Sequence, residues 1–225
     1  MSDEYSSSRS GARLMNLLDL RAACSPRLAP SFLEFGHAMT IPAGRVLVNF
    51  GEQPDRLYYI HSGLVCGSRI LDDGKEIFAV ILGQNSIFPD VFYFANIPSE
   101  SQMRTLRETR VSVFDRQTVD RLMRNPQFVH FITSSLAFKG VNSANRLVSR
   151  LNDGRREKVL HLLYELAFFE GIKSAEGYLL HFSQEELASI LGMHRVTISK
   201  ILSDFQRDGI VLCRRNCIRL LDGSA

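Results

Sequence analysis

The stretch from residue 183 to residue 219 holds the side chains best suited to binding a charged polymer. The whole chain is nearly balanced, with 27 Lys and Arg against 24 Asp and Glu and a net charge of +3. Between residues 194 and 219, basic residues outnumber the two acidic ones, Asp204 and Asp208, and they are Arg195, Lys200, Arg207, Arg214, Arg215 and Arg219. A local excess of positive charge in a balanced chain is typical of a surface that binds phosphates.

The spacing of residues in this stretch predicts two short helices joined by a sharp turn. Ser183 and Glu186 have the spacing of a capping box, and Gly192 supplies the turn after Leu191. The second helix is expected from Arg195 to Arg207. Its apolar residues share one face and its polar residues the other; the first set is Ile198, Ile201, Leu202 and Phe205, and the second is Arg195, Val196, Ser199, Lys200 and Ser203.

A small hairpin follows the second helix. The apolar runs 210–213 and 217–221 flank Arg214, Arg215 and Asn216, so the predicted turn is basic and suited to phosphate contact. A helix-turn-helix followed by such a hairpin is a winged helix, in which the second helix enters the major groove of DNA. The residues expected to contact DNA are Ser183, His194, Arg195, Val196, Thr197, Ser199, Lys200, Arg214 and Arg215. The alternative is a small helical packing module whose basic face is merely solvated.

The first half of the chain has a different pattern of apolar and turn residues. Short apolar runs at 46–50, 57–60, 64–71 and 77–82 each end at Gly, Asp or Ser, which predicts an antiparallel sandwich or barrel. Asp73-Gly74 between two of these runs is a strong hairpin signal.

Long helices connect the two parts. Pro126 opens a glycine-poor stretch to about residue 152, a helix of roughly 37 Å, and a second helix is expected over 155–169. The fold class is therefore α+β, with an N-terminal arm carrying a short helix near 14–20 (1–30), a β-rich domain (31–124), a long helix (125–152) and a winged helix (153–225).

Composition excludes several classes. Hydrophobic residues make up 45% of the chain and charged residues 23%, as in a soluble globular protein. No apolar run reaches the roughly 18 residues of a membrane span, and the first 13 residues lack a secretory signal. Four cysteines do not make a disulfide framework, so we expect a cytoplasmic protein without a membrane partner.

With these motifs in view, the chain resembles the CRP/FNR regulators from about Ile41 to its C-terminus. The resemblance rests on Gly51-Glu52, Tyr59-Ile60, 63–65, 184–188, Gly192, Arg195 and 197–202. It implies an N-terminal β-roll, a jelly roll like that of cyclic-nucleotide-binding domains, and a homodimer joined along the long helices. It also implies a palindromic double-stranded operator, contact with RNA polymerase, and base reading by the positions of Arg195, Val196, Ser199 and Lys200. Many members carry Glu at the position of Val196, so we expect an A·T-rich step there.

The resemblance also indicates which effector classes to consider. Cyclic-nucleotide binders of this family have a Gly-Glu pair where this chain has Pro89-Asp90, and Pro lacks an N–H for phosphate. Arg104-Thr105 could still bind an anion, but cAMP is not expected. An iron–sulphur cluster lacks thiolates, because only Cys24 precedes Cys66. Haem would need ligands such as His61, His130 or Cys66, which are isolated in the sequence.

Within the family, residues 83–87, the aromatic run after them, Lys139 and residues 163–166 resemble the chlorophenol-sensing regulators of reductive dehalogenation. There, a lysine at the position of Lys139 meets a phenolate. A small aromatic or phenolic effector is therefore expected, with no resident cofactor or metal, at Val80, Asn85, Ser86, Phe88, Asp90, Phe92, Arg104 and Lys139. Asp90 opposes a carboxylate on such a ligand. The alternatives are a solvated Lys139 and core packing for Phe88, Phe92, Tyr93 and Phe94.

Three rival hypotheses stay open. A cupin-type enzyme would need clustered histidines, whereas His37, His61 and His130 are scattered, so we expect no catalytic residues. A constitutive DNA-binding protein would use its β-roll only for assembly. A redox-responsive regulator could use Cys213 and Cys217 at the wing, although small apolar strand residues are the plainer interpretation.

Overall fold

The computed structural model describes residues 26–70, 76–152 and 154–221. These residues form two compact units, 26–148 and 149–221, and the boundary lies inside the long helix.

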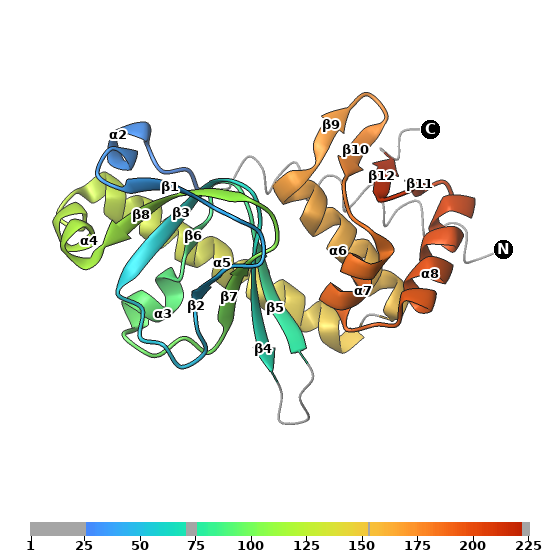
Figure 1. The fold of residues 1–225 in the computed structure, drawn as a ribbon, viewed down its shortest axis with the longest axis horizontal. Helices are drawn as coiled ribbons and strands as arrows, with labels where there is room; N and C mark the ends of the chain where they lie inside the picture. Colours follow the sequence, from blue (N-terminus) through green and yellow to red (C-terminus); the bar gives the residue numbers. More distant parts are fainter. Residues whose placement is uncertain (1–25, 71–75, 153, 222–225) are drawn as a thin grey trace. The chain divides into compact units, whose positions relative to one another are not determined.

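The first unit contains two four-stranded antiparallel sheets (Figure 1). One sheet has the order β1 (His37–Ile41), β8 (Thr109–Asp115), β3 (Arg56–Ser62) and β6 (Ile87–Phe88); the other has β2 (Val46–Val48), β7 (Gln102–Thr105), β4 (Val65–Ile70) and β5 (Glu76–Leu82). Strands β4 and β5 pair with Ile70 opposite Glu76, which confirms the predicted hairpin. Its Asp73-Gly74 turn lies outside the described residues.

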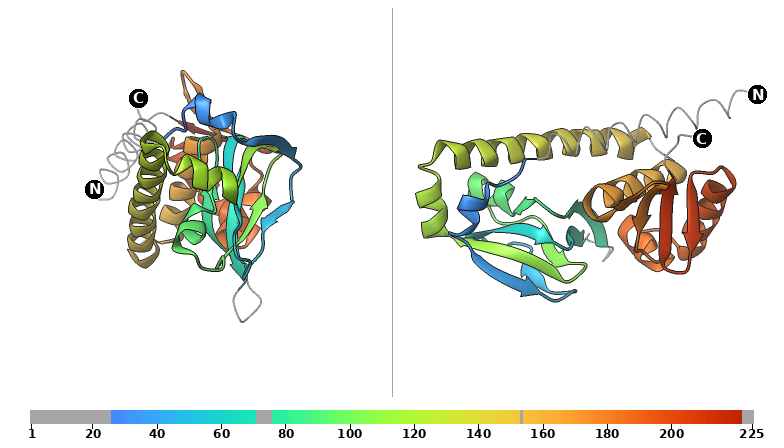
Figure 2. Two further views of the ribbon diagram at one scale, coloured as in Figure 1. Left: turned by 90° about the vertical axis from the view of Figure 1, so that its left-hand side faces the viewer. Right: turned by 90° about the horizontal axis from the view of Figure 1, so that it is seen from above.

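Four helices belong to this unit wholly or in part. They are α2 (Pro30–Leu33), α3 (Asp90–Ala95), α4 (Arg116–Leu122) and α5 (Pro126–Asn152). Helix α4 begins where the Asp115 carboxylate accepts a hydrogen bond from the Thr118 amide at 2.8 Å. Helix α5 begins at Pro126, as predicted, and its part within this unit runs along one side of the β-roll (Figure 2).

Strand β3 separates two apolar cores because its side chains alternate between its faces. Leu57 and Tyr59 pack with α2, α4 and α5, in the cluster that includes Phe114, Phe128, Phe131 and Ile132. Tyr58 and Ile60 pack between the sheets, in the cluster that includes Val65, Phe88, Met103 and Val111. The unit therefore has a sheet in the middle, with a second sheet on one side and helices on the other.

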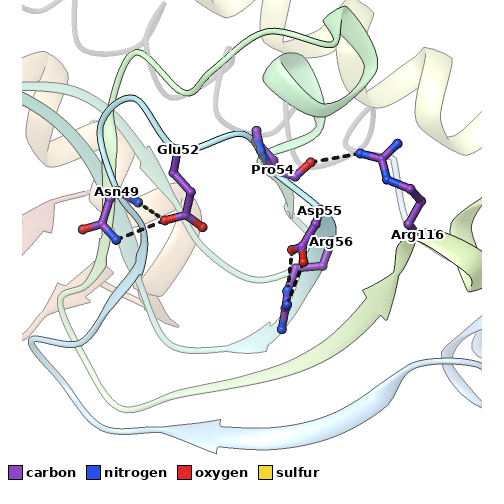
Figure 3. Close-up of polar contacts among 6 residues, drawn as sticks. All are labelled: Asn49, Glu52, Pro54, Asp55, Arg56 and Arg116. Atoms are coloured by element: carbon purple, nitrogen blue, oxygen red, sulfur yellow. Dashed lines mark hydrogen bonds and ion pairs between the residues drawn. The ribbon is translucent and has the colours of Figure 1, made fainter.

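The loop that follows β2 is held by its own polar groups (Figure 3). The Glu52 carboxylate accepts hydrogen bonds from the backbone and side-chain amides of Asn49, at 2.9 and 3.0 Å. Gly51 has a φ of 77°, which favours glycine. Further along, Arg116 donates to the Pro54 carbonyl at 3.3 Å. Gly51-Glu52 therefore shapes a turn here.

The second unit combines three helices with a four-stranded sheet (Figure 1). The helices are α6 (Arg155–Glu170), α7 (Gln184–Leu191) and α8 (Arg195–Arg207). The strands are β9 (Ile172–Ser174), β10 (Gly177–Leu180), β11 (Val211–Arg214) and β12 (Cys217–Leu221), in the order β11-β12-β10-β9. The predicted wing, β11 and β12, is thus extended by a second hairpin that the sequence analysis missed.

The predicted architecture of a β-roll, a long helix and a winged helix-turn-helix is confirmed. In the first unit, the elements without a counterpart among the predicted ones are helices α2, α3 and α4 and strands β1, β6, β7 and β8. The short helix predicted near 14–20 lies outside the described residues. Helix α3 was missed because its sequence, an aromatic run after Pro89, has no helical periodicity over its six residues.

Candidate functional site

Helices α7 and α8 meet at the sharp turn that the sequence predicted. The Ser183 hydroxyl accepts a hydrogen bond from the Glu186 amide at 3.1 Å, and the Glu186 carboxylate accepts one from the Ser183 amide at 2.7 Å. This capping box begins α7, and Gly192, with a φ of 61°, ends it. The chain then enters α8 at Arg195, with His194 at the N-cap position.

Helix α8 has one buried face and one exposed face. Its buried residues are those predicted: Ile198, Ile201, Leu202 and Phe205. His194, Arg195, Val196 and Lys200 are exposed, and Thr197 and Ser199 are half-buried. Val196 is 79% exposed, so its apolar side chain lies on the outer face of α8.

Contacts with its neighbours fix the orientation of α8. The Arg156 guanidinium lies 4.4 Å from the centre of the Phe205 ring and forms an ion pair with Asp208, just after the helix. The Gln206 side-chain carbonyl accepts a hydrogen bond from the Cys213 amide at 3.0 Å. Helix α6 and the wing therefore hold α8 with its polar face outward.

The wing presents the predicted cations. Arg214 ends β11 and pairs with Cys217, so the turn consists of Arg215 and Asn216 alone. Both arginines are exposed. Arg214 lies in the strand and not in the turn that the sequence predicts.

A contact that the sequence did not predict links α7 to α8. The Arg195 Nε atom lies 2.9 Å from the Glu185 Oε1 atom, and both side chains are exposed. Glu185 therefore supplies a counter-charge to the first residue of α8. Its position two residues after the Ser183 cap is visible in the sequence, but the pairing depends on the angle between the two helices.

In the first unit, two predicted effector residues bind each other. The Lys139 ammonium of α5 forms an ion pair with the Asp90 carboxylate and donates a hydrogen bond to the Ile87 carbonyl. The Ser135 hydroxyl donates to the other Asp90 oxygen at 3.4 Å. The Asp90 side chain is 2% exposed and that of Lys139 is 19% exposed. Lys139 is therefore neither solvated nor free to meet an anion.

The remaining predicted effector residues lie in several environments. Phe88 is 1% exposed and stacks on Tyr58 at 5.1 Å in the core between the sheets, against which Val80 also packs. Asn85 accepts a hydrogen bond from the Tyr59 hydroxyl at 2.9 Å. Ser86 and Phe92 are half-buried. Arg104 lies on the opposite face of β7 from Met103, a neighbour of Phe88 in the core.

The predicted effector residues have different partners: Phe88 packs in the core between the sheets, whereas Asp90 and Lys139 bind each other. Core packing is confirmed for Phe88 and Tyr93, which have relative exposures of 1% and 6%. Thr105, beside Arg104, has its hydroxyl committed to the Pro42 carbonyl at 2.7 Å. The signal for the Asp90–Lys139 pair was present in the sequence, because each is a single charge beside apolar residues.

His61 has a local hydrogen-bond partner, and the two wing cysteines point to different faces. The His61 Nε2 atom hydrogen-bonds with the Ser112 hydroxyl at 2.8 Å, and burial, with a smaller effect of Arg110, lowers the pKa of His61. Cys213 is opposite Ile218 and Cys217 is opposite Arg214, which places the two thiols on different faces of the wing. Burial raises the pKa of Cys213. Within the described ranges, no three His, Cys, Asp or Glu residues are grouped to hold a metal.

Two families match the chain over separate ranges. Residues 38–125 match the cyclic nucleotide-binding domain, and residues 157–225 match the Crp-like helix-turn-helix domain. The CRP-like cAMP-activated global transcriptional regulator of Mycobacterium tuberculosis is 27% identical over 186 residues, which cover 80% of this chain and 82% of that protein.

Solved structures share the fold. FixK2 from Bradyrhizobium japonicum superposes with a TM-score of 0.71 at 15% identity, over 84% of this chain and 93% of that one. CprK complexed with OCPA has a TM-score of 0.60 at 20% identity, over 86% of this chain and 90% of that one. No helix in the described part of the chain is long and apolar enough to cross a membrane.

Proposed function

The chain belongs to the CRP/FNR family of DNA-binding transcriptional regulators, and from this premise we propose that it is a dimeric, effector-responsive regulator that reads a palindromic operator. The observation that carries the proposal is helix α8. Its apolar face is buried, while Arg195, Val196 and Lys200 are exposed beside a wing with exposed Arg214 and Arg215. No reaction is assigned to the chain.

Each part of this surface has a separate task in the proposal. Arg195 contacts a guanine edge, and Val196 packs against a thymine methyl, which favours an A·T pair at that step. The wing arginines, together with Ser183 and His194, contact the phosphate backbone and fix the register without reading sequence. An operator that requires G·C opposite Val196 would contradict this assignment.

The exposed face of α5 supports the proposed homodimer. Ala137, Gly140, Val141 and Ala144 lie along this face, and all are exposed. A Cβ atom added at Gly140 would meet nothing within 4 Å, so a second helix could approach closely there. In a dimer joined at this face, the two α8 helices would engage half-sites about one DNA turn, roughly 34 Å, apart.

A charge on the exposed face of α5 tests the dimer. We expect Val141→Glu to shift the full-length chain toward monomer in sedimentation and to weaken operator binding. Gln117→Glu adds the same charge at an exposed position of α4 and serves as the control. An unchanged dimer in the Val141→Glu variant would contradict the proposed interface.

We further propose that the effector is an uncharged aromatic or phenolic molecule rather than cAMP. Asp90 already neutralises Lys139, so an anionic ligand would meet a carboxylate instead of an unpaired ammonium. Pro89 offers no N–H to a phosphate. Phe92 is half-buried, so part of its ring stays accessible to a flat apolar ligand.

The effector can regulate only through differential affinity. It must bind the DNA-competent arrangement of the dimer more tightly than the other arrangement. Isothermal titration measures the affinity of phenols, benzoates and cAMP for the protein, with and without operator, and tests this requirement. Equal affinity in both states would contradict effector control, and tight cAMP binding would contradict the proposed ligand class.

The Asp90–Lys139 ion pair favours a second candidate function, constitutive DNA binding. Because Lys139 already has its counter-charge within the chain, the β-roll could be held in one state without a ligand. Specific, strong gel shifts at 150 mM salt with no small molecule added would favour this candidate. Redox control has less support, since Cys213 and Cys217 point to different faces of the wing.

A further inference from the structure

Arg195 occupies an electrostatically unfavourable place for a cation. It is the first residue of α8, whose first turn holds no acidic residue. The N-terminus of a helix carries a partial positive charge, which disfavours a guanidinium nearby. The counter-charge comes from another helix, because Glu185 in the first turn of α7 holds the Arg195 Nε atom at 2.9 Å.

The ion pair with Glu185 leaves most hydrogen-bond donors of Arg195 available for DNA. A guanidinium has five N–H donors, and contact at Nε occupies one of them. The two terminal Nη groups stay available, and two donors are what the O6 and N7 acceptors of guanine require. We propose that Glu185 is a positioning residue that holds the Arg195 guanidinium in the orientation for a bidentate guanine contact.

Glu185 has a second effect through its charge. A carboxylate beside the DNA-facing surface repels phosphates, and an arginine that it holds is less able to turn toward the backbone. Arg195 therefore contributes less to sequence-independent binding than the exposed Lys200 or Arg215. Glu185 raises the ratio of specific to non-specific binding. This inference rests on the proposed function, because it assumes that α8 enters the major groove.

The test compares two carboxylate deletions that break an arginine pair in the same unit. Glu185→Gln removes the Arg195 partner. Asp204→Asn removes the Arg207 partner, whose Nη2 atom lies 3.0 Å from the Asp204 carboxylate, and so changes the net charge equally. Full-length wild type and both variants select duplexes from a random pool, with and without a panel of phenols.

We expect Glu185→Gln to relax the preference at one G·C pair in each half-site by about threefold to tenfold while other positions keep theirs. Its binding to duplexes without the motif should rise about twofold to fivefold. Asp204→Asn should keep the preference at every position, and thermal unfolding should show that both variants fold.

Two outcomes overturn the inference and are distinguishable. If the wild type selects a motif but Glu185→Gln leaves it unchanged, relaxes every position equally or behaves like Asp204→Asn, Glu185 is not a positioning residue. If the wild type selects no motif under any condition, the proposed function fails and the inference fails with it. Loss of preference at a single base pair is a result that a merely structural role for Glu185 does not produce.

Discussion

The two units place their predicted functional residues in opposite environments. In residues 149–221, Arg195, Val196, Lys200 and the wing arginines are exposed on a surface whose reverse side is core. In residues 26–148, Phe88 is in the core, and Asp90 and Lys139 bind each other. A surface that meets a large polymer needs only one amphipathic helix held outward, whereas a site for a small molecule needs side chains left unpaired inside the fold.

The largest expected effect concerns the buried pair. Asp90→Ala should lower the free energy of unfolding by about 3–5 kcal/mol, because Lys139 keeps a mostly buried charge without a partner. Urea unfolding followed by circular dichroism measures this change. Removing both charges, with Asp90→Asn and Lys139→Gln together, should recover much of the loss. A loss in the free energy of unfolding below about 1 kcal/mol would show that solvent, and not Asp90, stabilises the Lys139 charge.

Arg195→Ala should show the contrasting behaviour of the exposed surface. The free energy of unfolding should change by less than about 0.5 kcal/mol, because the side chain is 66% exposed. Operator affinity should fall about 10-fold to 100-fold in a gel shift, with a much smaller effect on unrelated duplexes. An equal loss on both kinds of DNA would assign Arg195 to the phosphate backbone.

Ser183→Ala tests whether the cap that begins α7 is structural. Loss of the hydroxyl acceptor for the Glu186 amide should cost about 1 kcal/mol and speed hydrogen exchange at that amide. Ser189→Ala, at an exposed position inside α7, should cost nothing, since Ala has the higher helix propensity. Similar results for both variants would contradict the capping role.

The smallest effect is expected at the wing. Arg215→Ala should weaken all duplexes alike, by a few-fold, and reduce the slope of log affinity against log salt by about 1. Arg110→Ala removes an equal charge from an exposed position of β8 and should leave the slope unchanged. A sequence-dependent loss would show that the wing reads bases as well as phosphates.

The same contrast explains what the sequence could predict. Helix α8 was predicted with its bounds and its buried face, because 3.6-residue periodicity over 13 residues is a strong signal. The capping box and Gly192 marked the helix-turn-helix equally well. The pairing of Glu185 with Arg195 depends on how two helices cross, and no local pattern encodes that angle.

Prediction was weaker in the β-roll for a physical reason. An apolar or aromatic residue in a short strand packs against a core or lines a cavity with the same local pattern. Phe88 and Phe92 therefore entered one predicted site, although Phe88 stacks on Tyr58 between the sheets. Asp90 and Lys139 lie 49 residues apart, and their contact arises only when α5 folds against the turn after β6.

The sheet order of the second unit would allow the wing to lengthen without a change in the position of α8. Strand β12 lies between β11 and β10, and Arg219 on β12 forms an ion pair with Glu176. The two-residue tip, in which Asn216 adopts a left-handed φ of 54°, extends beyond this anchored ladder. Insertions at the tip would carry its cations outward by roughly 3.3 Å for each added residue pair without moving α8. The span of backbone covered and the bases recognised can therefore vary independently.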